Sequence, residues 1–330
     1  MIETLYIEDD VATHAVTQRI RRRFPAATVI SIERYGEVFN RKAQNFRLQK
    51  RNPALILARK HERQVLPAPP GYGLGAPRNY YISHMLNCVY DCRYCFLQGM
   101  YRSAHYVLFV NYVDFQTAMA ETLASAPAEP TFFFTGYDCD SLALEPVSGY
   151  VADLLPFCEQ YPGAGFELRT KSTQIRTLLN RPALANVVIA YSFTPAPIAA
   201  ALEHKAPSVE RRIAALCALA ERGWPVGLRF DPLIYCVDFR LQYRELFRAI
   251  FARVPAERIH SVTWGPFRLP KPFFQAVAKL YPDEPLFANQ FAEHNGVLSY
   301  PPPWAQELRE FCVTELARYV PAAKLFSCEF

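Results

Sequence analysis

The chain has 330 residues, of which 51% are hydrophobic and 20% are charged. This composition fits one large or two smaller globular domains and excludes a disordered, collagen-like or coiled-coil protein. No run of about 18 apolar residues occurs, so we expect no membrane span. The first residues, MIETLYIEDDVATHAV, lack the basic region and apolar core of a signal peptide, and we therefore expect a cytoplasmic protein.

The net charge of +5 is concentrated near the N-terminus. Residues 1–70 contain 13 Lys/Arg and 7 Asp/Glu, whereas the remaining 260 residues contain 23 and 24. Such a local excess can bind a polyanion such as nucleic acid, and it can equally be a solvated face of the protein. Most of it comes from one short stretch, which we call the basic segment: Arg41, Lys42, Arg47, Lys50, Arg51, Arg59, Lys60 and Arg63.

The order of the predicted elements indicates an α/β fold. Residues 10–24 predict a helix and 27–32 a strand, and the Pro- and Gly-rich stretch 66–73 predicts a break. Beyond it, buried strands alternate with helices, a pattern typical of a parallel sheet and here of a complete or partial β/α barrel. The expected strands are 80–85, 106–111, 131–135, 165–170, 187–192, 226–231 and 259–264, and the expected helices are 115–125, 147–161, 172–179, 209–222, 239–253 and 272–281.

Three of the nine cysteines lie together in NCVYDCRYCF, residues 87–96, directly after the first expected barrel strand. Their spacing is C-x3-C-x2-C, formed by Cys88, Cys92 and Cys95. In a reducing compartment such a cluster favours metal ligands over disulfides. Three thiolates can hold a [4Fe–4S] cluster and leave one iron open for a small molecule, here S-adenosylmethionine. The alternative is a zinc site with a fourth ligand from His84 or His105.

The motif CVYDCRYC has the signature spacing of the radical SAM superfamily, and the wider stretch NCVYDCRYCFLQGMYRSAHYVLFVNYVDF resembles spore photoproduct lyases. The resemblance covers most of the chain and includes FFFTGYDCDSLALE, LRTKSTQIRTLL, VVIAYSF and GPFRLPKPFFQAVAKLYP. It implies a partial (β/α)6-type barrel with a small N-terminal α/β extension and a C-terminal hairpin plus helix. We expect a basic α/β subdomain over residues 1–70, the barrel over 71–285, and the hairpin and helix over 286–330.

The resemblance also implies roles for single residues. Cys88, Cys92 and Cys95 bind the cluster, and Tyr94 lies near the adenine of S-adenosylmethionine. Lys171 matches a family lysine at a strand end, and its charge can meet the carboxylate of the cofactor. A solvated lysine at the start of a helix is the alternative for this position. Ser192 matches a family serine at the end of the next strand and can hydrogen-bond the cofactor.

The chain departs from the family where a hydrogen atom is returned to the product. The family has a cysteine and, two residues later, a serine that contacts the cofactor; here these positions hold Tyr137 and Cys139. The family tyrosine after the third cluster cysteine is Phe96 here, which cannot donate a hydrogen atom. Tyr137 and Cys139 are thus the candidate catalytic residues. We place both on one strand face, and Cys139 can equally be an inert buried thiol.

A second departure concerns the β-hairpin that the family uses at the damaged base pair. The matching region is 289–300, with Asn295-Gly296 as a two-residue turn signal. Its tip carries Glu293 and His294 in place of a basic pair, so a plain surface hairpin is the expected interpretation. A proline run at 301–303 ends it before a last helix over 305–319.

The resemblance implies a radical SAM lyase that reverses a thymine–thymine photoproduct in DNA by means of a 5′-deoxyadenosyl radical. The expected partners are UV-damaged DNA, with the lesion outside the base stack and phosphates on the basic segment, and an external one-electron reductant such as a flavodoxin or ferredoxin. We expect a monomer. Two alternatives stay open: a radical SAM enzyme acting on another nucleic-acid lesion, an RNA or a peptide, and a zinc-stabilised nucleic-acid-binding module.

Overall fold

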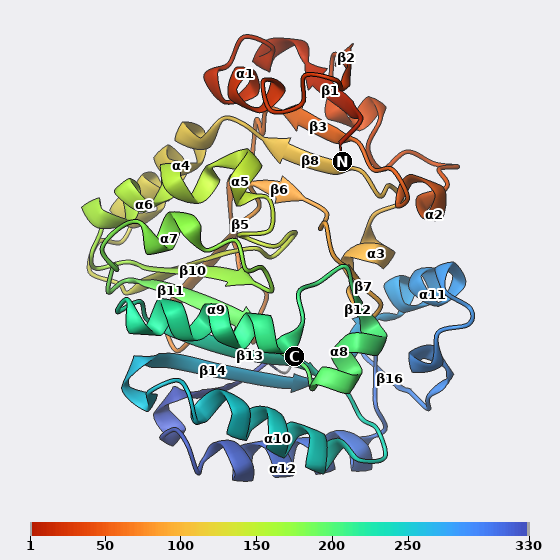
Figure 1. The fold of residues 1–330 in the computed structure, drawn as a ribbon, viewed down its shortest axis with the longest axis vertical. Helices are drawn as coiled ribbons and strands as arrows, with labels where there is room; N and C mark the ends of the chain where they lie inside the picture. Colours follow the sequence, from red (N-terminus) through yellow and green to blue (C-terminus); the bar gives the residue numbers. More distant parts are fainter. Residues whose placement is uncertain (1, 329–330) are drawn as a thin grey trace.

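The core of the protein is a curled eight-stranded sheet, seen in a computed structural model that describes residues 2–328 (Figure 1). All neighbouring strands run parallel except the first pair along the chain, β4 and β5, which is antiparallel. The expected partial barrel is therefore confirmed. In sheet order the strands are β18 (Leu325–Ser327), β14 (Ile259–Pro266), β13 (Val226–Leu233), β11 (Val187–Ser192), β10 (Gly165–Thr170), β9 (Thr131–Thr135), β5 (Arg78–Ile82) and β4 (Val65–Pro67).

The barrel strands form where the sequence is apolar without alternation. Every residue of β9 and β11 is buried, as expected for strands covered on both faces. Helices connect the parallel strands: α4 (Tyr112–Ala124), α5 (Glu145–Ser148), α6 (Tyr150–Gln160), α7 (Arg176–Leu179), α8 (Ala196–Leu202), α9 (Val209–Glu221) and α10 (Phe239–Phe251). None of the helices in the described part of the chain has the length and apolarity that a membrane crossing requires.

The helix expected over 172–179 forms only from Arg176 onwards. Side chains compete for the backbone before that point. The hydroxyl of Thr170 accepts a hydrogen bond from the Ser172 amide (2.8 Å), and the hydroxyl of Ser172 accepts one from the Gln174 amide (3.1 Å). Residues after β10 therefore stay in a loop, and Lys171 lies at the barrel mouth.

The N-terminal extension is a second, five-stranded sheet above the barrel in Figure 1. Its order is β2 (Thr28–Ile32), β1 (Thr4–Glu8), β3 (Leu55–Ala58), β8 (Tyr106–Phe109) and β6 (Met85–Leu86), with α1 (Ala15–Arg21) and α2 (Phe46–Gln49) beside it. We expected β8 in the barrel, but it pairs with β3. Its four residues are all buried, and an apolar run indicates burial without indicating the partner strand. One continuous core joins both sheets.

The C-terminal part covers the barrel mouth and then returns to the sheet. The hairpin of β16 (Ala292–His294) and β17 (Val297–Ser299) pairs with β15 (Arg268–Pro270). Its turn has positive φ at Asn295 (48°) and Gly296 (76°), as the sequence predicts. Helix α11 (Lys271–Leu280) packs on α3 (Leu97–Met100), where a Cβ on Gly99 would lie 2.4 Å from the carbonyl oxygen of Phe273. Helix α12 (Pro302–Leu316) leads to β18.

Candidate active site

One cavity of about 500 Å³ lies at the carboxyl ends of the barrel strands. Its volume falls in the range of small-molecule sites, about 300–1,000 Å³. Residues from the loop after β5, from the ends of β9, β10, β11 and β13, and from β15 and β17 surround it. All eight residues that the sequence singled out line this cavity: Cys88, Cys92, Tyr94, Cys95, Tyr137, Cys139, Lys171 and Ser192.

The cysteine loop is held by its own backbone and by one asparagine. Asn87 has φ of 73° and donates side-chain hydrogen bonds to the carbonyls of Ser103 (2.9 Å) and His105 (3.1 Å), while its side-chain oxygen accepts the Cys88 amide (2.9 Å). Further along, β7 (Asp91–Cys92) pairs with β12 (Glu203–His204). These contacts thus fix the cysteine loop at Cys88 and at Cys92.

The three cysteines fit an iron–sulfur cluster better than a zinc ion. All three are free thiols on one cavity wall, the donor set that iron–sulfur clusters take. A tetrahedral zinc site would bring sulfurs to about 3.8 Å from one another, given Zn–S bonds of about 2.3 Å. Among residues 2–328, the three thiols do not form a group with all ligand atoms within 4.8 Å.

The two histidines considered as a fourth zinc ligand lie outside the cavity. His84 stacks on Tyr150, with ring centroids 3.7 Å apart, and burial together with the charge of Lys60 lowers its pKa to about 3. His105 accepts the amide of Ala54 at Nδ1 (3.0 Å). Neither histidine is among the residues that line the cavity. The structure therefore provides no histidine ligand for the zinc alternative among the residues it describes.

Tyr94 is fixed between a buried carboxylate and a lysine. Its hydroxyl donates to Glu203, which also accepts from Thr194 (3.1 Å) and forms a buried ion pair with Arg212. The Lys171 ammonium lies 5.5 Å from the centre of the Tyr94 ring. Because its hydroxyl is occupied, Tyr94 offers the cavity its ring rather than a polar group.

Asp140 positions the start of the Lys171 loop, and the sequence did not indicate it. One carboxylate oxygen accepts from the Thr170 hydroxyl (2.6 Å) and the other from the Lys171 amide (2.6 Å). The first oxygen also accepts the amides of Leu142 (3.0 Å) and Ala143 (2.9 Å). Asp140 therefore connects the loop after β9 to the end of β10 and holds the Lys171 backbone.

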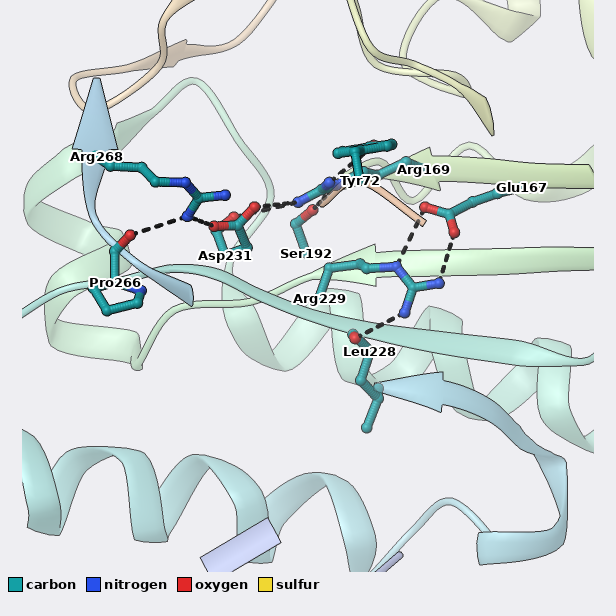
Figure 2. A network of polar contacts seen from close by, with 9 residues as sticks. All are labelled: Tyr72, Glu167, Arg169, Ser192, Leu228, Arg229, Asp231, Pro266 and Arg268. Atoms are coloured by element: carbon teal, nitrogen blue, oxygen red, sulfur yellow. Dashed lines mark hydrogen bonds and ion pairs between the residues drawn. The ribbon is translucent and has the colours of Figure 1, made fainter. Parts of the chain in front are cut away.

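Figure 2 shows a polar network at the ends of β10, β11 and β13 that the sequence also did not predict. Arg169 donates to Ser192 (3.3 Å) and to the Tyr72 hydroxyl (3.2 Å), and it lies 3.7 Å from a carboxylate oxygen of Asp231. Arg268 donates to the other carboxylate oxygen of Asp231 at 3.0 Å. Two guanidinium groups thus share one carboxylate.

Below this network, Arg229 forms a buried ion pair with Glu167, with the two closest atoms 2.6 Å apart. Asp231 lines the cavity, whereas Arg229 is not among the lining residues.

Tyr137 lies in a group of aromatic rings on the cavity wall. Its ring centre is 4.6 Å from that of Tyr81, 5.5 Å from Tyr72 and 5.6 Å from Phe96. Burial is the main cause that raises the pKa of Tyr137, so the phenol keeps its hydrogen. Burial likewise raises the pKa of the Cys139 thiol. Both groups are therefore present in the form that can give up a hydrogen atom.

The expectation that Tyr137 and Cys139 lie on one strand is wrong, because β9 ends at Thr135. Both residues are in the following loop, which begins at Gly136 with φ of 80°. A Cβ there would lie 2.5 Å from the Ser141 hydroxyl and 2.8 Å from the Arg169 carbonyl. This turn, rather than strand alternation, directs both side chains to the cavity.

The basic segment is only partly a surface feature. Lys50 is buried, and its ammonium donates to the carbonyls of Cys88 (3.4 Å) and Tyr90 (3.1 Å). Lys50 is thus unavailable to DNA phosphates, and the sequence-based grouping is corrected at this position. Arg59 and Lys60 are partly exposed, and five residues are exposed: Arg41, Lys42, Arg47, Arg51 and Arg63.

A partial β/α barrel with three cysteines on the loop after its first parallel strand, all facing one cavity, defines a radical SAM enzyme. The family model for spore photoproduct lyase matches residues 75–325. The chain belongs to the spore photoproduct lyase family.

Curated relatives agree with this family at low identity. The spore photoproduct lyase of Bacillus subtilis (strain 168) is 20% identical over 287 residues, which cover 85% of this chain and 82% of the relative. The enzyme of the same name from Clostridium acetobutylicum is 23% identical over 171 residues, covering 52% and 51%.

Solved structures share the fold across the whole chain. A spore photoproduct lyase complexed with dinucleoside spore photoproduct superposes with a TM-score of 0.86 at 16% identity, covering 100% of this chain and 99% of the other. A mutant with bound AdoMet and the same photoproduct gives 0.85 at 16% identity, with the same coverage.

Proposed function

We propose that the protein is a radical SAM lyase that reverses the thymine–thymine spore photoproduct in DNA. The observation that carries this proposal is the single cavity in which the three cysteines face the ends of the barrel strands, in a chain that the family model matches over residues 75–325. The solved relatives that hold AdoMet and dinucleoside spore photoproduct support the same substrate class.

The residues around the cysteines would form the cofactor end of the cavity. S-adenosylmethionine beside a reduced [4Fe–4S] cluster supplies a 5′-deoxyadenosyl radical when both are bound. Cys88, Cys92 and Cys95 would hold the iron, and Lys171 would present a positive charge to the carboxylate of the cofactor. Ser192 carries a hydroxyl at the end of β11 on the same cavity wall. The Tyr94 ring lines this end of the cavity.

The far end of the cavity suits a nucleobase lesion. Apolar side chains from β15, α11 and the hairpin line it, among them Leu269, Phe273 and Val297. Arg268, which is paired with Asp231, lies beside them. A lesion that leaves the base stack would present an apolar face, and these side chains offer a counterpart to it.

We assign the return of the hydrogen atom to Tyr137. Its phenol lines the cavity and stays protonated, and the family resemblance aligns it with the family cysteine. In this step the O–H bond of Tyr137 breaks homolytically, a C–H bond forms on the product radical, and a tyrosyl radical remains. Cys139 is the alternative donor, because its thiol lines the same cavity in the same protonation state.

The remaining partners follow from the chemistry. The reaction needs an external one-electron donor, for which a flavodoxin or ferredoxin is suitable. Nine free cysteines favour a reducing compartment, in agreement with a cytoplasmic location. We further propose that the protein acts as a monomer.

The proposal is tested with protein reconstituted anaerobically with iron and sulfide, a chemical reductant, and a dinucleotide spore photoproduct. We expect S-adenosylmethionine-dependent recovery of thymine nucleotide, and none from the Cys92→Ala variant. A reconstituted protein that makes no 5′-deoxyadenosine would contradict the enzyme class.

A second candidate keeps the radical chemistry and changes the substrate to another nucleic-acid lesion, an RNA or a peptide. The observation that favours it is the altered hydrogen-return pair, Tyr137 and Phe96, whose ring centres lie 5.6 Å apart. Formation of 5′-deoxyadenosine without recovery of thymine in the same assay would support this candidate.

A further inference from the structure

Lys50 is a buried cation that the proposed reaction does not use. It follows α2, is 6% exposed, and its own carbonyl accepts a hydrogen bond from the Lys205 ammonium (3.1 Å). Among residues 2–328 its ammonium makes no ion pair. A charge removed from water in this way needs a counter-charge or strong hydrogen-bond acceptors.

The acceptors that Lys50 finds belong to the cysteine loop. Its ammonium donates to the carbonyls of Cys88 (3.4 Å) and Tyr90 (3.1 Å), which lie at and just after the first of the three cysteines. Burial lowers the pKa of Lys50, whereas Asp91 and the thiols of Cys88 and Cys95 raise it. The ammonium therefore contacts the backbone of the residue that carries the first of the three thiols.

Asp91, the carboxylate that acts on Lys50, is paired with other groups. Asp91 forms an ion pair with Arg93 (2.9 Å) and accepts from the Tyr281 hydroxyl (3.2 Å). The negative charges near Lys50 are therefore Asp91 and, once they bind iron, the cysteine thiolates. A cluster gains one electron on reduction, and a buried positive charge beside it stabilises the more negative state.

We propose that Lys50 is a positioning residue that holds the cysteine loop through two carbonyls and whose charge raises the reduction potential of the [4Fe–4S] cluster. The inference rests on the cluster of the proposed function and not on the lesion. Failure of photoproduct repair would therefore leave it intact.

The test is a redox titration of the reconstituted protein, followed by the EPR signal of the reduced cluster, without DNA. The variants are Lys50→Met, which removes charge and donors, Lys50→Gln, which keeps a donor without charge, and Lys50→Arg, which keeps both. Lys42→Met is the matched control, because Lys42 is an exposed lysine of the same segment.

We expect the ratio of reduced to oxidised cluster at a fixed potential to fall about tenfold in Lys50→Met and Lys50→Gln, which is about 59 mV for one electron. The Lys50→Arg and Lys42→Met variants should stay close to the parent. Equal potentials in all five proteins would overturn the proposal. A change in Lys50→Met alone would overturn the charge effect, since Lys50→Gln lacks the charge as well.

A variant that assembles no cluster does not end the test. If Lys50→Met fails in this way, the comparison of Lys50→Gln with Lys50→Arg decides the question. Circular dichroism of the iron-free proteins shows whether each variant is folded.

Discussion

The residues that line the cavity include two sets with different chemistry. Cys88, Cys92 and Cys95 offer sulfur ligands from one short loop, whereas Tyr137 and Cys139 offer hydrogen atoms from the loop after β9. The two sets lie on one cavity, so ligand binding and hydrogen transfer can be disturbed separately by substitution.

Replacing one cluster ligand should abolish iron binding without unfolding the chain. We expect Cys92→Ala to retain about tenfold less iron than the parent after reconstitution, because two remaining thiolates cannot hold the cluster. Iron content and visible absorbance measure the loss. The matched control is Cys236→Ala, a partly exposed free cysteine that does not line the cavity, which should bind iron like the parent.

Removing one phenol oxygen should separate radical formation from product recovery. We expect Tyr137→Phe to lower thymine recovery about tenfold while 5′-deoxyadenosine still forms, because the ring is kept and only the O–H hydrogen is removed. Both products are measured by chromatography in the same reaction. Cys139→Ala is the companion variant: if it abolishes thymine recovery while Tyr137→Phe does not, the thiol is the donor and our assignment is wrong.

The residues that belong to sequence motifs could be predicted from the sequence. The residues whose role depends on contacts with other strands could not. The spacing of the cysteines and the family resemblance placed eight side chains on one cavity. The roles of Asp140 and Arg169 come from partners on other strands, such as the Lys171 amide for Asp140, and no motif marks them. Lys50 was grouped with the basic segment but is buried, because a run of basic residues does not show which member is buried.

At the level of elements, the neighbouring strands β10, β11 and β13 are joined by backbone hydrogen bonds. A buried ion pair between β10 and β13 adds to them. Arg229 on β13 reaches Glu167 on β10, and both side chains are 1% exposed. Arg229 also donates to the carbonyl and hydroxyl of Ser261 on β14 (3.1 and 2.9 Å). These contacts hold four neighbouring strands beneath the site.

Breaking this pair should destabilise the barrel. We expect Arg229→Met to lower the free energy of unfolding by about 3–5 kcal/mol, because Glu167 would keep a buried, uncompensated charge. Urea denaturation measures the change. Arg181→Met is the control: its partner Glu159 is 49% exposed, and removal of that pair should change stability by at most about 1 kcal/mol. Equal destabilisation of both variants would contradict the account.

The hairpin should affect substrate binding rather than cofactor binding. Val297 of β17 lines the apolar end of the cavity, whereas Glu293 of β16 is exposed and paired with Lys271. We expect Val297→Asp to raise the KM for a photoproduct oligonucleotide about tenfold, since a carboxylate there would be desolvated by a bound base. Affinity for S-adenosylmethionine, measured by calorimetry, should not change. Glu293→Gln should resemble the parent in both measurements, and a parent-like KM in Val297→Asp would remove the hairpin from the site.

Strands and turns were predicted correctly where a single local feature of the sequence determines them. The Asn295-Gly296 turn and the fully buried strands follow from turn chemistry and apolar runs. The placement of β8 in the N-terminal sheet depends on its partner strand, β3. The late start of α7 depends on hydroxyl contacts at Thr170 and Ser172. Neither cause leaves a periodic signal in the sequence.

For the whole molecule, the exposed part of the basic segment is the candidate surface for the DNA backbone. We expect Arg47→Gln combined with Arg51→Gln to weaken binding of duplex DNA and to reduce the slope of log K against log salt by about 0.9 for each phosphate that is no longer neutralised. Fluorescence anisotropy across a salt series measures the slope. The control pair is Arg211→Gln with Arg222→Gln, exposed residues at the two ends of α9. An equal effect of both pairs would show that net charge, rather than this surface, governs binding.

The central claim is that three cysteine thiolates bind an iron–sulfur cluster whose remaining iron accepts S-adenosylmethionine. EPR spectroscopy of the reduced, reconstituted protein with and without S-adenosylmethionine tests it most directly. We predict the signal of a [4Fe–4S] cluster that changes on addition of the cofactor and is absent in Cys92→Ala. One zinc per chain without iron, or a cluster signal that S-adenosylmethionine leaves unchanged, would contradict the claim.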